Sequence, residues 1–183
     1  MADDFPSLVS LACHDLRTPL ATVQGFAKTL LRVDDLDEEK RTRYLGLIDA
    51  ASSELVTLLD LLSLAARIEG GRYDPIVREA DSLQLAPAGA SGAGAAVNVD
   101  PEAVATALSS LARAAARHGG VEVSTTVDGS SIAIEPVVAA AAPVVLGEEQ
   151  KDLGAAVAVR LIRALGGDVT LDGERLTVTL PVV

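Results

Sequence analysis

The sequence predicts an α+β protein in two parts, an antiparallel helical hairpin followed by helices layered on a β-sheet. Apolar residues recur at three- and four-residue steps through two long segments near the amino end. In the second half, segments of alternating apolar and polar residues are separated by Asp-Gly turns and by helical segments. A Gly70-Gly71 pair ends the second long segment. We therefore expect a hairpin domain over residues 1–70 and a second domain over residues 71–183.

The composition excludes several classes of protein. The 183 residues carry a net charge of −11, and no basic stripe is present, so we expect neither nucleic-acid binding nor attraction to an anionic membrane. The single cysteine, Cys13, rules out an intramolecular disulfide and a cysteine-based zinc site. No signal peptide and no apolar run of membrane-spanning length is present, which predicts a cytoplasmic protein.

The hairpin itself predicts a dimer. The first helix is expected over residues 7–32, and the second begins near Asp37, where acidic residues meet the positive end of the helix dipole. A single hairpin leaves half of its apolar stripe in water. Two hairpins packed as a four-helix bundle bury it, so we expect a homodimer formed through residues 7–66.

The second half predicts a sheet covered by helices. Asp100 and Pro101 are typical of a helix start, and Asp128-Gly129 and Asp172-Gly173 are typical of hairpin turns. The expected elements are, in order, a short helix or extended piece at 75–85, a small-residue loop at 87–96, a strand at 95–99, a helix at 101–118, a hairpin at 121–137, a helix at 153–165 and a hairpin at 168–182.

The most informative string is CHDLRTPL, residues 13–20. Pro19 lies inside a helical pattern and has no N–H, so the carbonyl of Asp15 loses its partner and we expect a kink there. The Thr18 hydroxyl is placed to bond back to the carbonyl of His14. The kink then lies next to His14 and leaves polar backbone available to a ligand.

His14 is the candidate nucleophile. A neutral imidazole is a good nucleophile near neutral pH, because its unperturbed pKa is about 6.5. Asp15 can hold one ring nitrogen as the N–H and leave the other free to attack, and Arg17 can meet phosphate oxygens with its fork of donors. Thr18 shares the face of His14. A lone histidine on a helix is usually a surface residue without a function. The hypothesis that His14 is functional therefore rests on the residues around it in the string 13–20.

Residues 10–31, SLACHDLRTPLATVQGFAKTLL, resemble the H-box of two-component sensor histidine kinases, their dimerisation and phosphoacceptor segment. The resemblance continues to about residue 70. It implies that His14 is the phosphoacceptor, that Asp15 assists proton removal from the imidazole, and that Thr18 helps to orient water in dephosphorylation. Arg17 and Pro19 match further positions of the motif.

The second half resembles the ATP-binding domain of the same family in order and length but not in chemistry. Ser110 and Ala114 stand where these kinases have asparagines that hold magnesium and phosphates. No glycine occurs between Ser130 and Leu146, where the adenine-contacting motif belongs, and only Gly154 remains of the glycine-rich box. The lid between these motifs is short. The resemblance therefore predicts a degenerate domain, with no cofactor and no metal bound by this chain.

The favoured hypothesis is a histidine phosphotransferase of a phosphorelay. No input domain precedes the H-box in this sequence, and a histidine without an ATP site or a sensor suits an intermediate between receiver-domain aspartates. The resemblance is then to freestanding dimeric histidine phosphotransferases with a vestigial kinase domain. The expected partner is a response-regulator receiver domain, which supplies the Mg²⁺. We expect it to contact Arg17, Val23, Gln24 and Lys28.

Two alternatives stay open. One is a divergent sensor histidine kinase fragment that phosphorylates itself through an unrecognised ATP site. The other is a non-catalytic pseudokinase that docks and sequesters a response regulator. The second histidine, His118, is interpreted as a helix-end residue rather than a catalytic one.

Overall fold

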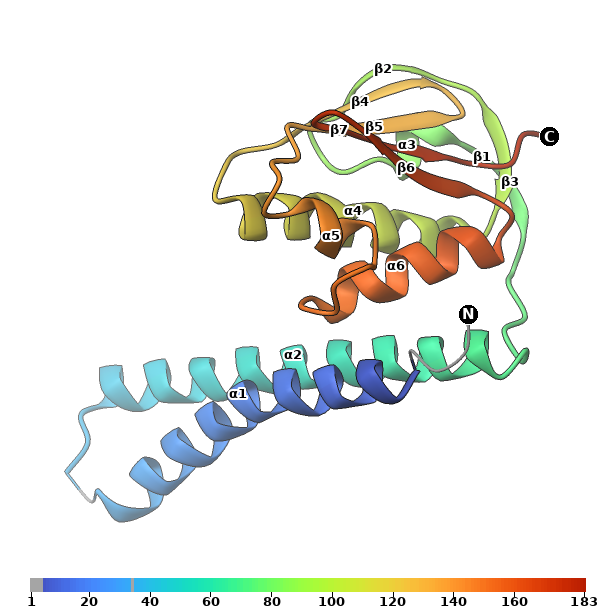
Figure 1. The fold of residues 1–183 in the computed structure, drawn as a ribbon. Coiled ribbons are helices and arrows are strands. Elements are labelled where there is room, and N and C mark those ends of the chain that lie inside the picture. The colour runs from blue at the N-terminus through green and yellow to red at the C-terminus, as the bar shows by residue number, and fades with distance from the viewer. Residues whose placement is uncertain (1–4, 34) are drawn as a thin grey trace. The chain divides into compact units, whose positions relative to one another are not determined.

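The computed structural model describes residues 5–33 and 35–183 (Figure 1). Its contacts divide the chain into two compact units, one ending at Ser63 and one comprising Leu64–Val183. The division falls inside the second long helix, so the last turns of that helix belong to the second unit. Each unit is described below by itself.

The first unit is a helical hairpin. Helix α1 spans Phe5–Arg32 and helix α2 spans Glu38–Glu69, as the periodicity of the sequence predicts. The carboxylate of Asp37 accepts a hydrogen bond of 2.8 Å from the backbone N–H of Lys40, which caps the start of α2. Near the turn, the rings of Phe26 and Tyr44 lie 5.0 Å apart between centroids and join the two helices.

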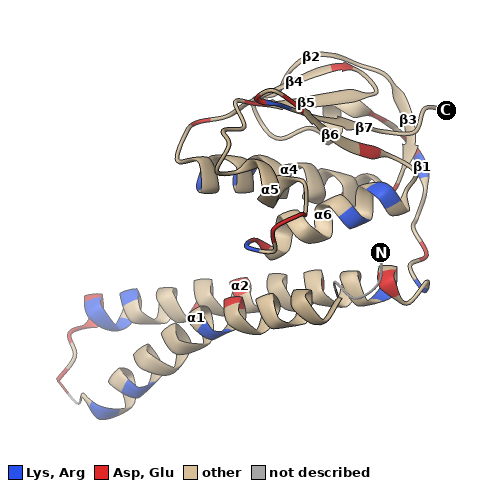
Figure 2. Cartoon of the chain, viewed as in Figure 1, with Lys and Arg blue, Asp and Glu red and all other residues tan. Residues whose placement is uncertain are grey.

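Acidic and basic residues are mixed around the turn between α1 and α2 (Figure 2). The ammonium group of Lys40 lies 2.8 Å from Asp37, and the Arg41 guanidinium lies 4.0 Å from Glu38. The hydrogen bond from the Lys40 side chain lowers the pKa of Asp37 below its ordinary value. All four side chains are exposed, so these pairs contribute little to stability.

The second unit is an α+β layer domain with a five-stranded mixed sheet in the order β2-β4-β5-β7-β6. Strands β2 and β4 are parallel and the other neighbours are antiparallel. A separate antiparallel pair joins β1 and β3. The strands are β1 Arg78–Asp81, β2 Ser91–Gly94, β3 Ala96–Val99, β4 Ser124–Gly129, β5 Ser131–Glu135, β6 Asp168–Asp172 and β7 Arg175–Thr179. The helices are α3 Ser82–Leu85, α4 Pro101–Gly119, α5 Ala142–Val145 and α6 Leu153–Ala164.

Helices α4 and α6 cover one face of the five-stranded sheet and form the core with it (Figure 1). Ile132 of β5 lies opposite Val127 on one side and opposite Val178 on the other, and all three side chains are buried. Helix α4 begins at Asp100, whose side chain accepts from the N–H of Ala103, and ends at Gly120 with a left-handed φ of 64°. The predicted cap, proline and glycine signals are confirmed.

Two elements differ from the sequence-based expectation. The predicted small-residue loop contains strand β2, in which Gly92 has a φ of 123° and lies so close to β4 that a Cβ would overlap the carbonyl oxygen of Val127. Helix α5 was not predicted, because it has only four residues and includes Pro143. Near residues 75–85 the sequence predicts either a short helix or an extended piece, and the structure contains one of each, strand β1 followed by helix α3.

The end of α2 and the segment after it are part of the second unit. Leu64, Ile68 and Tyr73 pack against its core. Glu69 lies 3.0 Å from the guanidinium of Arg160 on α6. The guanidinium of Arg67 lies 5.7 Å from the centre of the Tyr73 ring. The second domain is thus assembled on the final turns of the hairpin helix.

Tyr73 provides a prediction in alkaline solution. Its buried hydroxyl has no hydrogen-bond partner among the described residues. Burial, followed by the negative charge of Asp100, raises the pKa of Tyr73 to about 12. Between the unfolded value near 10 and the folded value, the unfolded chain releases a proton that the folded chain retains, so the free energy of unfolding falls as pH rises.

We expect Tyr73→Phe to remove a tyrosinate absorbance step near pH 12 and to flatten this alkaline loss of stability. Below pH 10 the variant should be at least as stable as the native chain, because a buried hydroxyl with no hydrogen bond of ordinary geometry among the described residues carries a desolvation cost that phenylalanine lacks. A tyrosinate difference spectrum between the two proteins, with thermal melts at the same pH values, measures both effects. A Tyr73 step at the ordinary tyrosine value contradicts the assignment.

Candidate phosphoacceptor site

The first candidate site lies on the helix α1 and is built around His14. The helix continues through Pro19 without a break, and the proline ring is buried. The predicted bond from the Thr18 hydroxyl to the carbonyl of His14 is not formed among the described residues. Instead, the hydroxyl of Thr22 donates to the carbonyl of Thr18 at 3.2 Å. The Thr18 side chain is exposed and free to face a ligand.

The imidazole of His14 is open to solvent and is held by its neighbour. Its side chain is 78% exposed, while that of Asp15 is 28% exposed. The Nδ1 atom of His14 lies 3.2 Å from the Oδ1 atom of Asp15. When the proton is on Nδ1, donation to the carboxylate leaves Nε2 with a free lone pair directed away from Asp15. This is the geometry of an oriented, accessible nucleophile.

Three of the four expected partner-contact residues lie on one ridge of α1 with His14. Arg17 lies three residues after His14, Gln24 lies two turns after Arg17, and Lys28 lies four residues after Gln24; all four side chains are exposed. Val23 does not belong to this ridge. It is half-buried and lies nine positions after His14, which places it about half a turn around the helix. The structure therefore does not bring Val23 together with the other three.

The second candidate site is the region of α4 and α6 that corresponds to the degenerate ATP site. Ser110 and Ala114 are buried on α4, and Ser110 lies against Gly154 of α6. A Cβ added at Gly154 would lie 3.3 Å from the Cβ of Ser110. Helices α4 and α6 are therefore in direct contact here.

A carboxylate already occupies the amino end of α6. The Oδ1 atom of Asp152 accepts from the N–H of Ala155 at 3.0 Å. Its Oδ2 atom lies 3.5 Å from Nε2 of His118, at the carboxyl end of α4. An anionic ligand would meet the negative charge of Asp152 at the very groups that bind anions at a helix start.

The segment between β5 and α6 closes the same region. Its side chains Val137, Ala141, Val144 and Val145 are buried in the core cluster, and α5 packs against both α4 and α6. In place of a lid over a ligand, the segment is part of the hydrophobic core. The residues present do not fit a bound nucleotide.

Sequence reasoning did not find Asp152 and left His118 as a helix-end residue. Asp152 does have a signal, because an aspartate directly before LGAAV is a typical helix cap. Its pairing with His118 has no local signal, since the two residues meet only when α4 and α6 pack. Among the described residues, no group of three or more His, Cys, Asp or Glu side chains is arranged to hold a metal ion.

The hairpin carries an exposed histidine that contacts a carboxylate, and a helix-covered sheet follows it. This combination is typical of histidine-kinase-like proteins. The family model of the His Kinase A (phospho-acceptor) domain matches residues 7–71. The fold is similar to that of the Acinetobacter baumannii histidine kinase AdeS, with a TM-score of 0.63 and 18% sequence identity over 92% of this chain and 98% of that chain. A comparison with curated proteins finds no match.

Residues 7–71 match the phosphoacceptor domain of the two-component histidine kinase family, and the chain shares the fold of a histidine kinase. The predicted family and the predicted α+β fold are both confirmed. This family implies dimerisation and a response-regulator partner in general. Within the described part of the chain, no helix combines the length and the apolar character that crossing a bilayer requires.

Proposed function

We propose that this protein is a histidine phosphotransferase, which carries a phosphoryl group on His14 between the aspartates of response-regulator receiver domains. The observation that carries the proposal is the contrast between the two sites. His14 is exposed and oriented by Asp15, at 3.2 Å, whereas the α4–α6 region is packed and already holds a carboxylate. In this proposal His14 is the acceptor, and the described α4–α6 region does not suit a nucleotide donor.

The chemical step needs little from this chain. Nε2 of His14 forms a bond to phosphorus as the phosphorus–oxygen bond of the receiver's aspartyl phosphate breaks, and the electron pair leaves with the receiver carboxylate. The proton on Nδ1 stays on the ring, where the Asp15 carboxylate stabilises the positive charge that develops. The reverse step delivers the group to a second receiver. The Mg²⁺ belongs to the receiver, and this chain binds no cofactor in the proposal.

The remaining residues position the partner. Arg17 is exposed one turn after His14, where its guanidinium can meet phosphate oxygens in the reacting complex. Gln24 and Lys28 continue the same ridge and are proposed to contact the receiver. Thr18 is proposed to orient water when the phosphohistidine is hydrolysed. Since Val23 lies off the ridge, we assign it no direct contact.

Labelled phosphate separates this proposal from an autokinase. We expect label from a phosphorylated receiver domain to reach the protein, and label from Mg-ATP not to reach it, because Asp152 and the packed helices exclude the triphosphate. Calorimetry with Mg-ATP should detect no complex with a dissociation constant of about 10 micromolar or lower, which corresponds to a binding free energy of about 7 kcal/mol.

Labelling from ATP would instead support a divergent kinase. Binding of the receiver without transfer in either direction would support a docking pseudokinase. As a control that the protein sample is active, protein labelled by the first receiver should pass its label to an added unphosphorylated receiver.

A further inference from the structure

The segment Gly70–Arg78, here called the strap, connects α2 to β1 within the second unit. Apolar burial does not hold its middle, because the side chains of Ile76 and Val77 are 74% and 45% exposed. Tyr73, before them, is half-buried, and Arg78, after them, enters the β1–β3 ladder opposite Val99. Between these two anchors a polar contact holds the strap.

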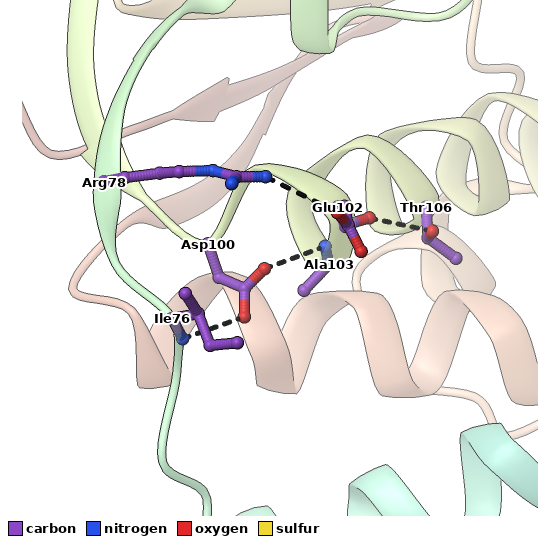
Figure 3. Close-up of polar contacts among 6 residues, drawn as sticks. All are labelled: Ile76, Arg78, Asp100, Glu102, Ala103 and Thr106. Atoms are coloured by element: carbon purple, nitrogen blue, oxygen red, sulfur yellow. Dashed lines mark hydrogen bonds and ion pairs between the residues drawn. The ribbon is translucent and has the colours of Figure 1, made fainter.

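That contact is the carboxylate of Asp100 (Figure 3). Its Oδ2 atom accepts from the backbone N–H of Ile76 at 3.2 Å, and its Oδ1 atom accepts from the N–H of Ala103 at 3.3 Å. One half-buried side chain therefore caps α4 and ties the strap to it. Hydrogen bonds to a charged acceptor are about twice as strong as neutral ones.

The other contacts at this point are weaker. The guanidinium of Arg78 lies 3.4 Å from Glu102, but both side chains are largely exposed, so water screens the pair. Thr106 bonds back to the carbonyl of Glu102 within α4 and does not touch the strap. Asp100 is thus the main polar anchor of the strap between Tyr73 and β1 among the described residues.

We propose that Asp100 is a latch that fixes the strap to the second domain, and that loss of its carboxylate turns the strap into a flexible linker. A latched strap makes the segment after α2 an ordered part of the second domain. The inference is independent of the proposed phosphotransfer, since it concerns the order of the strap alone.

Limited trypsin digestion of the full chain tests the latch, because Arg72 and Arg78 provide cleavage sites in the strap. Asp100→Ser is the informative variant. A serine hydroxyl still caps α4, but it is too short to reach the N–H of Ile76 as well. We expect the initial rate of cleavage in the strap to rise about tenfold, since local opening no longer breaks a charged hydrogen bond. Amide exchange at Ile76 should accelerate by a similar factor.

The matched control is Asp152→Ser, which changes the cap of α6 in the same way and lies outside the strap. Its cleavage in the strap should stay at the native rate. Asp100→Asn is a second variant, because an amide has only one oxygen and cannot accept at both positions.

Two results overturn the proposal. One is a native cleavage rate in both folded Asp100 variants, judged folded by circular dichroism. The other is an equal rise in the Asp152→Ser control, which would show that general destabilisation, and not the latch, exposes the strap.

Discussion

Replacing His14 by alanine is expected to abolish transfer of a phosphoryl group from a phosphorylated receiver domain, by more than about a thousandfold. The described residues of the ridge around His14 include no second histidine, so no other imidazole nitrogen can replace its Nε2 atom as the nucleophile. The fold should be unaffected. His14 is 78% exposed, and alanine is the better helix former by up to about 0.7 kcal/mol.

The chain supplies its own matched control in its second histidine. His118→Ala removes the contact of 3.5 Å to Asp152 and should lower the melting temperature slightly while leaving transfer at the native rate. Acid-labile, base-stable label on the native protein identifies phosphohistidine. Persistent labelling of the His14→Ala protein by a phosphorylated receiver would show that another residue is the acceptor.

The candidate site around His14 could be proposed from the sequence because its information is local. His14, Asp15 and Arg17 follow one another on a single helix, and helical spacing alone places the exposed residues on one ridge. Two local details differ from the expectation. The hydroxyl that bonds back in this stretch belongs to Thr22 rather than Thr18, and Val23 faces away from the ridge.

The second domain shows the opposite case. Caps and Asp-Gly turns identify α4, α6 and both hairpins, because each signal acts within a few residues. Strand β2 could not be identified that way, since SGAG has no strand propensity and forms a strand only by pairing with β4. The bonds of Asp100 to Ile76 and of Asp152 to His118 likewise depend on segments that meet through tertiary packing.

The second large effect concerns assembly. The outer face of α2 leaves apolar side chains in solvent in a single chain, including Leu45, Val56 and Leu59, the last of them 53% exposed. The half-buried Leu55 lies one turn before Leu59 on the same stripe. Burial of this stripe against a second hairpin is the reason that we expect a homodimer through residues 7–66.

Replacing Leu55 and Leu59 together by aspartate is therefore expected to give a monomer or an unfolded chain. Each unpaired carboxylate in an apolar seam costs several kcal/mol, and the two-fold axis places four of them in one interface. The dissociation constant should rise by more than about a thousandfold, since each 1.4 kcal/mol is a factor of ten. Light scattering at micromolar concentration measures the change in mass.

A matched control is the double variant Ser53→Asp and Thr57→Asp, which adds the same charge at the same spacing on an exposed polar side of α2. It should remain dimeric, because its carboxylates stay in water. A monomeric native protein contradicts the bundle outright. If the control dissociates as readily as the leucine variant, added negative charge alone separates the chains, and the apolar stripe of Leu55 and Leu59 is not the seam that joins them.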